Sequence, residues 1–204
     1  MMAKKFLIAG LVAGLVVAQG PAAFAAGSGS GSGSAPKVTT ATIITPEGAR
    51  VAQLAPEARA ALGKELLAGK QEINKYNLGI CHDAVCFTLF LLGSKITPNE
   101  LIDLRGQAWL PKLDYEKGTL WDGKSDIPAG KAIGFYRLKA IIEGMNIFHS
   151  AISTGGTKIR GVNAHGLTPG WSVEGDLKKA LGAPDKDGCF MYDGAKIKVY
   201  ISNL

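Results

Sequence analysis

The sequence has few residues of the kinds that cross-link a chain or bind metals. It holds three cysteines and three histidines in 204 residues, and aromatic residues make up 7% of it. Three cysteines are too few for a disulfide-dense scaffold. No paired C-x-x-C or H-x-x-x-H spacing supports a zinc site, so we predict neither a metal nor another cofactor.

Charge of one sign is also scarce. Charged residues are 20% of the chain, and 23 Lys and Arg against 17 Asp and Glu give a net charge of +6. The basic residues are scattered, without a stripe or interleaved aromatic residues, so we do not expect nucleic-acid binding. The hydrophobic content of 47% excludes a disordered chain and suffices for a core.

No apolar run is long enough for a stable membrane span. The longest at the N-terminus is Phe6–Ala18, which follows Lys4 and Lys5 and precedes the A-x-A site Ala23-Phe24-Ala25. This pattern is typical of a secretory signal peptide over residues 1–25, with a mature start at Ala26. It predicts a secreted or periplasmic protein.

A regular Gly/Ser stretch follows the predicted signal. Residues 27–34 alternate glycine and serine, a composition typical of a flexible linker. Natural linkers are rarely so regular, so residues 26–34 resemble an engineered joint, and the signal could have been added with it. Residues 35–204 are predicted to form one domain.

Hydrophobic periodicity and turn signals predict helices first and antiparallel strands afterwards. One predicted helix starts at Pro56, a second covers Cys81–Leu92, and a third runs from Thr97 to about Arg105. A fourth is capped by Ser172 and ends at Leu181. The predicted strands are Lys131–Leu138, Asn146–Ser153, Thr157–Val162, Cys189–Tyr192 and Lys196–Ser202. This order is typical of an α+β fold.

Cys81 is the candidate nucleophile. It stands at the predicted start of a helix that is apolar nearly all round, where free N–H groups stabilise a thiolate and an oxyanion. The alternative is that Cys81 is simply a small buried hydrophobic residue. His82 lies roughly 100° away around the helix and is a poor base for it. His149 lies on a predicted strand, and His165 lies in the following loop.

Three segments resemble the NlpC-type papain-fold cysteine peptidases, which hydrolyse cell-wall peptides. The segment from Cys81 to Gly93 resembles the family's nucleophile helix, D-C-S-G-[FL]-V followed by apolar residues and glycine. Residues 130–136 resemble its G-D-[LIV]-[VI]-F-[FY] strand, and residues 148–153 its H-[VA]-[GA]-[IV]-Y strand. The resemblance implies a papain-like fold, with the nucleophile helix packed on an antiparallel sheet and Cys81 and His149 as catalytic residues.

The third catalytic residue of the family falls near position 161, which is glycine here. Asn163 is the nearest polar residue on the same strand face, and we favour it over His165 as the residue that orients His149. Toward the substrate end of the site, Tyr76, His82 and Trp171 are candidate substrate-binding residues. Trp171 could equally be ordinary core packing.

The remaining cysteines allow one disulfide. A Cys86–Cys189 bridge would leave Cys81 free, as an oxidising compartment and an odd cysteine count permit. The alternative is that both are buried free thiols.

Two classes of enzyme and one class of binding protein fit these features. The first is a cysteine peptidase or amidase that acts on peptidoglycan stem peptides or cross-links. An antibacterial toxin would use the same chemistry and would have an immunity protein as partner. The second is a protein-directed glutamine deamidase, transglutaminase or protease. The third is a non-enzymatic secreted binding module.

Overall fold

The computed structural model describes residues 42–164 and 166–204. The predicted signal peptide, the predicted linker and His165 lie outside these residues. The described chain is a mixture of helices and an antiparallel sheet, so the predicted α+β class is confirmed. No helix among the described residues is both long and apolar enough to cross a membrane.

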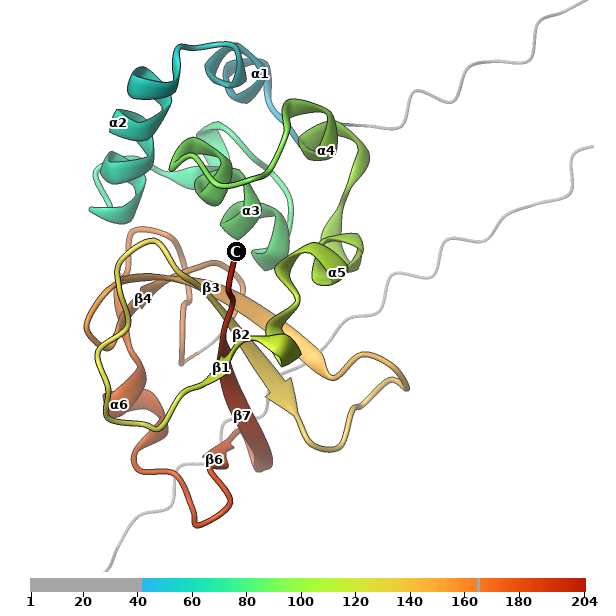
Figure 1. The fold of residues 1–204 in the computed structure, drawn as a ribbon, viewed down its shortest axis with the longest axis vertical. Coiled ribbons are helices and arrows are strands. Elements are labelled where there is room, and N and C mark those ends of the chain that lie inside the picture. Colours follow the sequence, from blue (N-terminus) through green and yellow to red (C-terminus); the bar gives the residue numbers. More distant parts are fainter. Residues whose placement is uncertain (1–41, 165) are drawn as a thin grey trace, which may run out of the picture. The chain divides into compact units, whose positions relative to one another are not determined.

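The helices come mostly from the first half of the described chain and gather on one side of the sheet (Figure 1). The α-helices are α1 (Pro46–Ala52), α2 (Pro56–Leu67), α3 (Cys81–Leu91), α4 (Pro98–Asp103), α5 (Leu110–Leu113) and α6 (Leu177–Leu181). Three short 3₁₀ turns connect them, at η1 (Ile73–Lys75), η2 (Gly106–Trp109) and η3 (Tyr115–Lys117).

The sheet has seven strands, and every pairing in it is antiparallel. The strand order is β1-β7-β2-β3-β4-β5, with β6 also pairing to β7. The strands are β1 (Thr119–Leu120), β2 (Ala132–Arg137), β3 (Ile147–Gly155), β4 (Lys158–Arg160), β5 (Gly175–Asp176), β6 (Phe190–Tyr192) and β7 (Ala195–Ile201).

Two apolar clusters cover the two faces of the sheet. One surrounds α3, whose residues are all buried, and includes Ile152 of β3. The other includes Ala151 of the same strand together with residues of β2, β6 and β7. Because successive strand residues point to opposite faces, β3 contributes to both clusters, and α3 packs on one of them.

Local signals explain most of the helix ends. Thr97 and Glu100 form the predicted capping box of α4, with hydrogen bonds of 3.3 Å from Glu100 N to Thr97 Oγ1 and 2.8 Å from Thr97 N to Glu100 Oε2. The predicted cap at Ser172 is wrong. Asp176 caps α6 instead, because residues 175–176 first pair with β4 and delay the helix.

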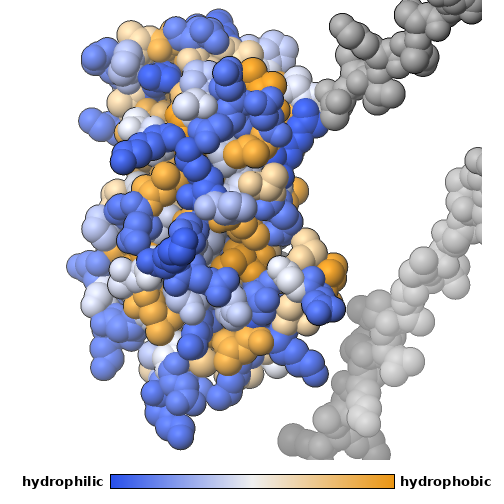
Figure 2. Space-filling view, turned by 45° about the vertical axis from the view of Figure 1, so that its right-hand side comes forward, coloured by the Kyte–Doolittle hydropathy of each residue, from blue (hydrophilic) through white to orange (hydrophobic). Residues whose placement is uncertain are grey.

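The surface in Figure 2 is mostly hydrophilic with scattered apolar patches. The loop between β2 and β3 exposes several of these apolar residues. Ile141 is 81% exposed and Ile142 61%, and Leu138 and Met145 lie in the same loop. Nothing in the described residues covers this loop.

Buried Arg160 joins α2 to the loop before β5. Its Nε donates to Leu67 O at 2.8 Å, and its Nη1 donates to Trp171 O at 2.9 Å and to Ser172 O at 3.0 Å. Carbonyl groups at a helix C-terminus lack partners within the helix, and the guanidinium satisfies one for α2. Arg160 therefore fixes the helical layer to the sheet.

We expect Arg160→Met to lower the free energy of unfolding by about 3 kcal/mol, because three backbone carbonyls lose the charged donor that the buried guanidinium supplies. The matched control is Lys158→Met on the same strand. Its partner Asp176 is 2.8 Å away, and the two side chains are 49% and 25% exposed, so we expect a loss below about 1 kcal/mol. Urea unfolding measures both, and equal losses would contradict the assigned role of Arg160.

Candidate active site

The site is built where the first turn of α3 meets β3. Cys81 is the first residue of α3, and Ile80 before it is in extended conformation. Asp83, the third helical residue, accepts from Ile80 N at 2.9 Å, which closes the first turn. A Cβ at Gly79 would collide with the Asp83 side chain, so glycine is needed there. This local geometry starts the helix at the cysteine.

The Asp83 carboxylate also anchors the first turn to the chain beyond α4. Its Oδ1 accepts from Gly106 N at 2.9 Å and from Trp109 Nε1 at 3.1 Å. All the interactions are with N–H donors, which an ionised carboxylate suits. Asp83 therefore has a positioning role that the sequence reading did not assign.

Cys81 Sγ occupies an unpaired position at the edge of β3. The pairing of Ile152 with Arg160 places the Ile152 peptide group toward β4, and Ser150, two residues away, faces the same edge. Because β4 ends at Arg160, it does not extend alongside Ser150, whose backbone N–H acts to lower the pKa of the Cys81 thiol. The N–H groups of His82 and Cys81 also interact with Sγ. Backbone N–H groups of the first helical turn and of β3 therefore favour the thiolate form of Cys81.

Burial outweighs these donors in setting the pKa of the thiol. Cys81 is only 6% exposed. Its pKa is raised, chiefly by desolvation, and the negative charge of Asp83 adds to the increase, whereas the backbone N–H groups oppose it. The expectation that the helix N-terminus yields a low thiol pKa is therefore wrong for this resting structure. Cys81 is a neutral thiol at pH 7.

His149 points to the sheet face opposite Ser150. Its ring lies 5.3 Å from the ring of Phe135, and its Nε2 is 2.8 Å from Thr168 Oγ1. The side chain is 2% exposed, and desolvation followed by the charge of His82 lowers its pKa to about 3. The ring is neutral at pH 7, and Nδ1 has no hydrogen-bond partner among residues 42–164 and 166–204.

Asn163 does not orient His149. It is exposed, in a left-handed conformation with φ of 66°, and among the described residues it makes no hydrogen bond to the ring. Thr168 takes that position because Ala164 and Thr168 pair across a tight loop, which turns the threonine back toward β3. No local pattern in the sequence signals this contact, since 19 positions separate Thr168 from His149. His165 lies outside the described residues.

His82 is fully buried against β3. Its Nδ1 is 2.7 Å from Ser150 Oγ, which also accepts a 2.7 Å hydrogen bond from Tyr115 OH. Tyr115 reaches Ser150 because Gly134, opposite Ser150 on β2, leaves space for its ring. Desolvation lowers the pKa of His82 to about 4. No pattern in the sequence indicated Tyr115 and Ser150 as parts of the site.

The register of β3 differs from simple alternation at one position. The sequence predicts that Phe148 shares a face with Ser150 and Ile152. An irregularity in the β2–β3 pairing between Phe135 and Tyr136 leaves Phe148 packed against the other cluster, where its ring stacks on that of Tyr192. An extra residue in one strand changes which face the side chain takes.

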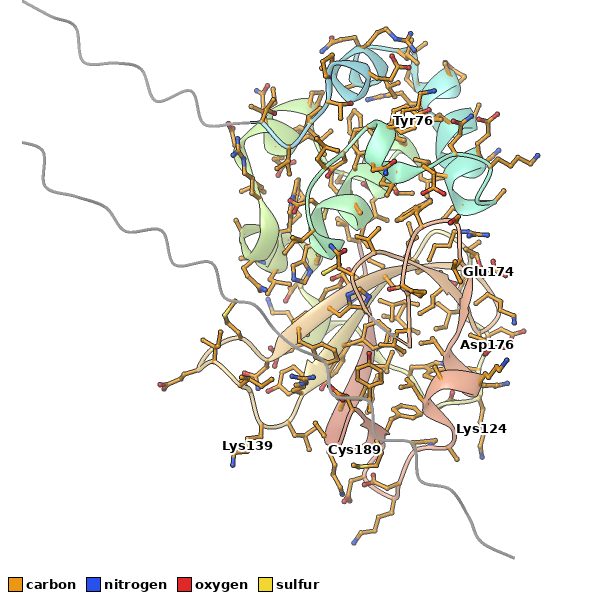
Figure 3. The ribbon with its side chains drawn as sticks, turned by 180° about the vertical axis from the view of Figure 1, so that it is seen from behind. Tyr76, Lys124, Lys139, Glu174, Asp176 and Cys189 are labelled. Carbon is orange, nitrogen blue, oxygen red and sulfur yellow. The ribbon has the colours of Figure 1, made fainter. Side chains whose placement is uncertain are left out.

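The side chains of Tyr76 and Trp171 are buried rather than exposed at the surface. Tyr76 is 3% exposed and stacks on Phe87, and Figure 3 places it among the helices. Trp171 is 1% exposed, and its Nε1 donates to Leu66 O at 3.0 Å. The packing alternative for Trp171 therefore holds, although one part of the residue lines the groove described next.

A groove of about 310 Å³ begins two residues before Cys81. It lies between residues 72–74 and 77–79 on one side and residues 162–163 and 169–171 on the other. Its polar lining includes Glu72, Asn74 and Asn163, and Leu78 is an exposed apolar residue in it. The exposed Asn163 thus belongs to this groove and not to the His149 contact.

The structure does not form the predicted Cys86–Cys189 disulfide. All three cysteines are buried free thiols. Cys86 lies inside the cluster around α3, whereas Cys189 lies beside β6, at the end of the sheet away from α3 (Figure 3). The two residues occupy different parts of the fold, so the alternative of free thiols describes them.

Comparison with known protein families gives no matching family model, and no curated protein matches the chain. The candidate site therefore rests on the geometry above. That geometry joins His82 to Ser150 on one face of β3 and His149 to Thr168 on the other, with Cys81 at the start of α3 beside His82, and it places Asn163, Tyr76 and Cys189 elsewhere.

The two buried histidines predict a loss of stability in mild acid. Their native pKa values of about 4 and about 3 lie below the ordinary value of 6.5. Between pH 6.5 and about 4 the unfolded chain therefore binds protons that the native chain does not. We expect the free energy of unfolding to fall by up to about 1.4 kcal/mol per pH unit for each ring as pH falls.

Urea unfolding at several pH values from 7 to 4.5 measures this slope. His149→Gln removes one of the two groups and should reduce the slope by about half. A free energy of unfolding that stays constant between pH 7 and pH 5 would contradict neutral buried rings.

Proposed function

We propose that this protein is a cysteine hydrolase that cleaves amide bonds, with Cys81 as nucleophile and His149 as general base. The observation that carries the proposal is the position of Cys81 among the free backbone N–H groups at the start of α3, next to His82, which contacts Ser150 of the strand that bears His149. Such donors stabilise a thiolate and the oxyanion of an acyl-transfer intermediate. A cysteine that served only as packing would not need them.

The residues support a general-base reaction that starts from neutral groups. Desolvation raises the pKa of Cys81 and lowers that of His149, so a resting thiolate–imidazolium pair is disfavoured. Cys81 would lose its proton to His149 as Sγ attacks the carbonyl, and the imidazolium would return a proton to the leaving amine. Thr168 holds Nε2 of His149 and leaves Nδ1 for this transfer.

We propose peptidoglycan peptides as the substrate class. The sequence resemblance to cell-wall peptidases suggests them, and the groove beside Gly79 supports a peptide ligand. Its carboxylate and amide side chains suit the amide groups and amines of an extended peptide. A protein substrate would use the same chemistry and is distinguished by the first experiment below.

We expect the purified protein to release soluble fragments from peptidoglycan, and Cys81→Ala to release none, because the nucleophile is lost. Cys86→Ala is the matched control, since it removes a buried α3 thiol whose pKa burial raises well above the usual value. Mass spectrometry of the fragments identifies the cleaved bond. Equal digestion by the protein and by Cys81→Ala would contradict the proposal. Cleavage of proteins that depends on Cys81, without cleavage of peptidoglycan, would show that the substrate is a protein and not peptidoglycan.

We expect Thr168→Val to lower kcat about 10-fold, because His149 loses the hydrogen bond that orients its ring, a loss of about 1.4 kcal/mol. Thr168→Ser keeps the hydroxyl and should retain most of the activity. Steady-state kinetics on the released fragments compare the two variants. Equal kcat values for the valine and serine variants would contradict an orienting role for Thr168.

A further inference from the structure

His82 is a polar residue in α3, a helix made mostly of apolar residues. It is 0% exposed, and it follows the candidate nucleophile in the first turn of α3. A buried polar ring destabilises a protein unless its polar atoms form hydrogen bonds. One ring nitrogen does so, because Nδ1 is 2.7 Å from Ser150 Oγ.

The hydrogen-bond chain bears on where the proton of the His82 ring lies. Tyr115 OH donates to Ser150 Oγ at 2.7 Å. The single proton of Ser150 is then free to be donated to Nδ1 of His82, and we assign this direction to the hydrogen bond. The neutral imidazole therefore carries its own proton on Nε2. Its pKa of about 4 keeps it neutral at pH 7.

Nε2 of His82 has no partner in the part of the chain that the structure describes, although it is buried. A buried N–H donor without an acceptor is unusual and costly in a native protein. Such a donor is explained if its acceptor arrives with a ligand or forms during a reaction.

Ser150 places this donor and the nucleophile at the same residue of β3. Its backbone N–H acts to lower the pKa of Cys81, and its hydroxyl lies 2.7 Å from Nδ1 of His82, the next residue of the same helical turn. We infer that the Nε2–H of His82 is the side-chain donor that stabilises the oxyanion formed when Cys81 attacks a carbonyl group. This inference rests on the proposed function and adds His82 to it as a catalytic residue.

In the step concerned, a bond forms between Cys81 Sγ and the carbonyl carbon, and the π electrons of the carbonyl move to its oxygen. The thiol proton passes to His149. His82 keeps its proton and shares it with the negatively charged oxygen. When the intermediate collapses, the carbonyl re-forms, the bond to the leaving group breaks, and His149 returns its proton to an amine leaving group.

Two reagents separate oxyanion stabilisation from the reactivity of the thiol, and neither depends on the natural substrate. p-Nitrophenyl acetate acylates Cys81 through a tetrahedral oxyanion and releases p-nitrophenolate. Iodoacetamide alkylates Sγ by direct displacement of iodide, without an oxyanion. The measured quantity is the ratio of the two second-order rate constants in the full chain, after subtraction of the Cys81→Ala background.

We expect His82→Leu to lower the acylation rate about 100-fold and to change the alkylation rate less than about 3-fold, since loss of one oxyanion donor has effects of this size. His82→Gln places an amide N–H near the position of Nε2 and should recover much of the acylation rate. Ser150→Ala keeps the ring but removes the partner that fixes its proton, so we expect an intermediate ratio. This variant also tests the inference if His82→Leu does not fold.

An acylation-to-alkylation ratio that is the same in the protein and in the folded His82 and Ser150 variants would overturn the inference. A parallel fall of both rates would give that same ratio, and would assign His82 a structural role. The proposed function fails by a different result, namely peptidoglycan and protein digestion that does not depend on Cys81. The two failures are therefore distinguishable.

Discussion

Because β4 ends at Arg160, it does not extend alongside Ser150 on β3, and the first turn of α3 contacts Ser150 through His82, whose Nδ1 lies 2.7 Å from the serine hydroxyl. The first turn of α3 is held there by Asp83, whose carboxylate binds the backbone on both sides of the helix start. Ser150 is thus one of the residues at which the helical layer and the sheet meet, together with Arg160. Every other part of the candidate site is positioned relative to this contact.

Burial determines the electrostatics of the site. Desolvation raises the pKa of Cys81 and lowers the pKa values of His82 and His149, so all three groups are neutral at rest. The backbone donors around Sγ are already in place, but they do not compensate for the loss of water. Charge separation would therefore occur during the proposed reaction, when a substrate carbonyl is present to accept the negative charge. A site of this kind limits the reactivity of the free thiol.

Much of the fold could be predicted from local sequence signals. The apolar run after Cys81 predicted α3, the capping box predicted α4, and the glycine turns predicted the β3–β4 and β6–β7 hairpins. Prediction was less successful where elements depend on distant partners. Residues 175–176 pair with β4 and delay α6, and the irregular β2–β3 register moves Phe148 to the other face. Neither effect leaves a periodic signal in its own segment.

The sequence by itself determined that a cysteine begins a buried helix and that a histidine lies on a strand in the antiparallel half of the chain, because helix starts and strand alternation depend on neighbouring residues. Only the tertiary structure decided their partners. Thr168 rather than Asn163 contacts His149, Tyr115 and Ser150 hold His82, and Cys86 and Cys189 remain apart. These contacts join residues distant in the chain, and their geometry follows from where β4 ends and how its loop returns to β3.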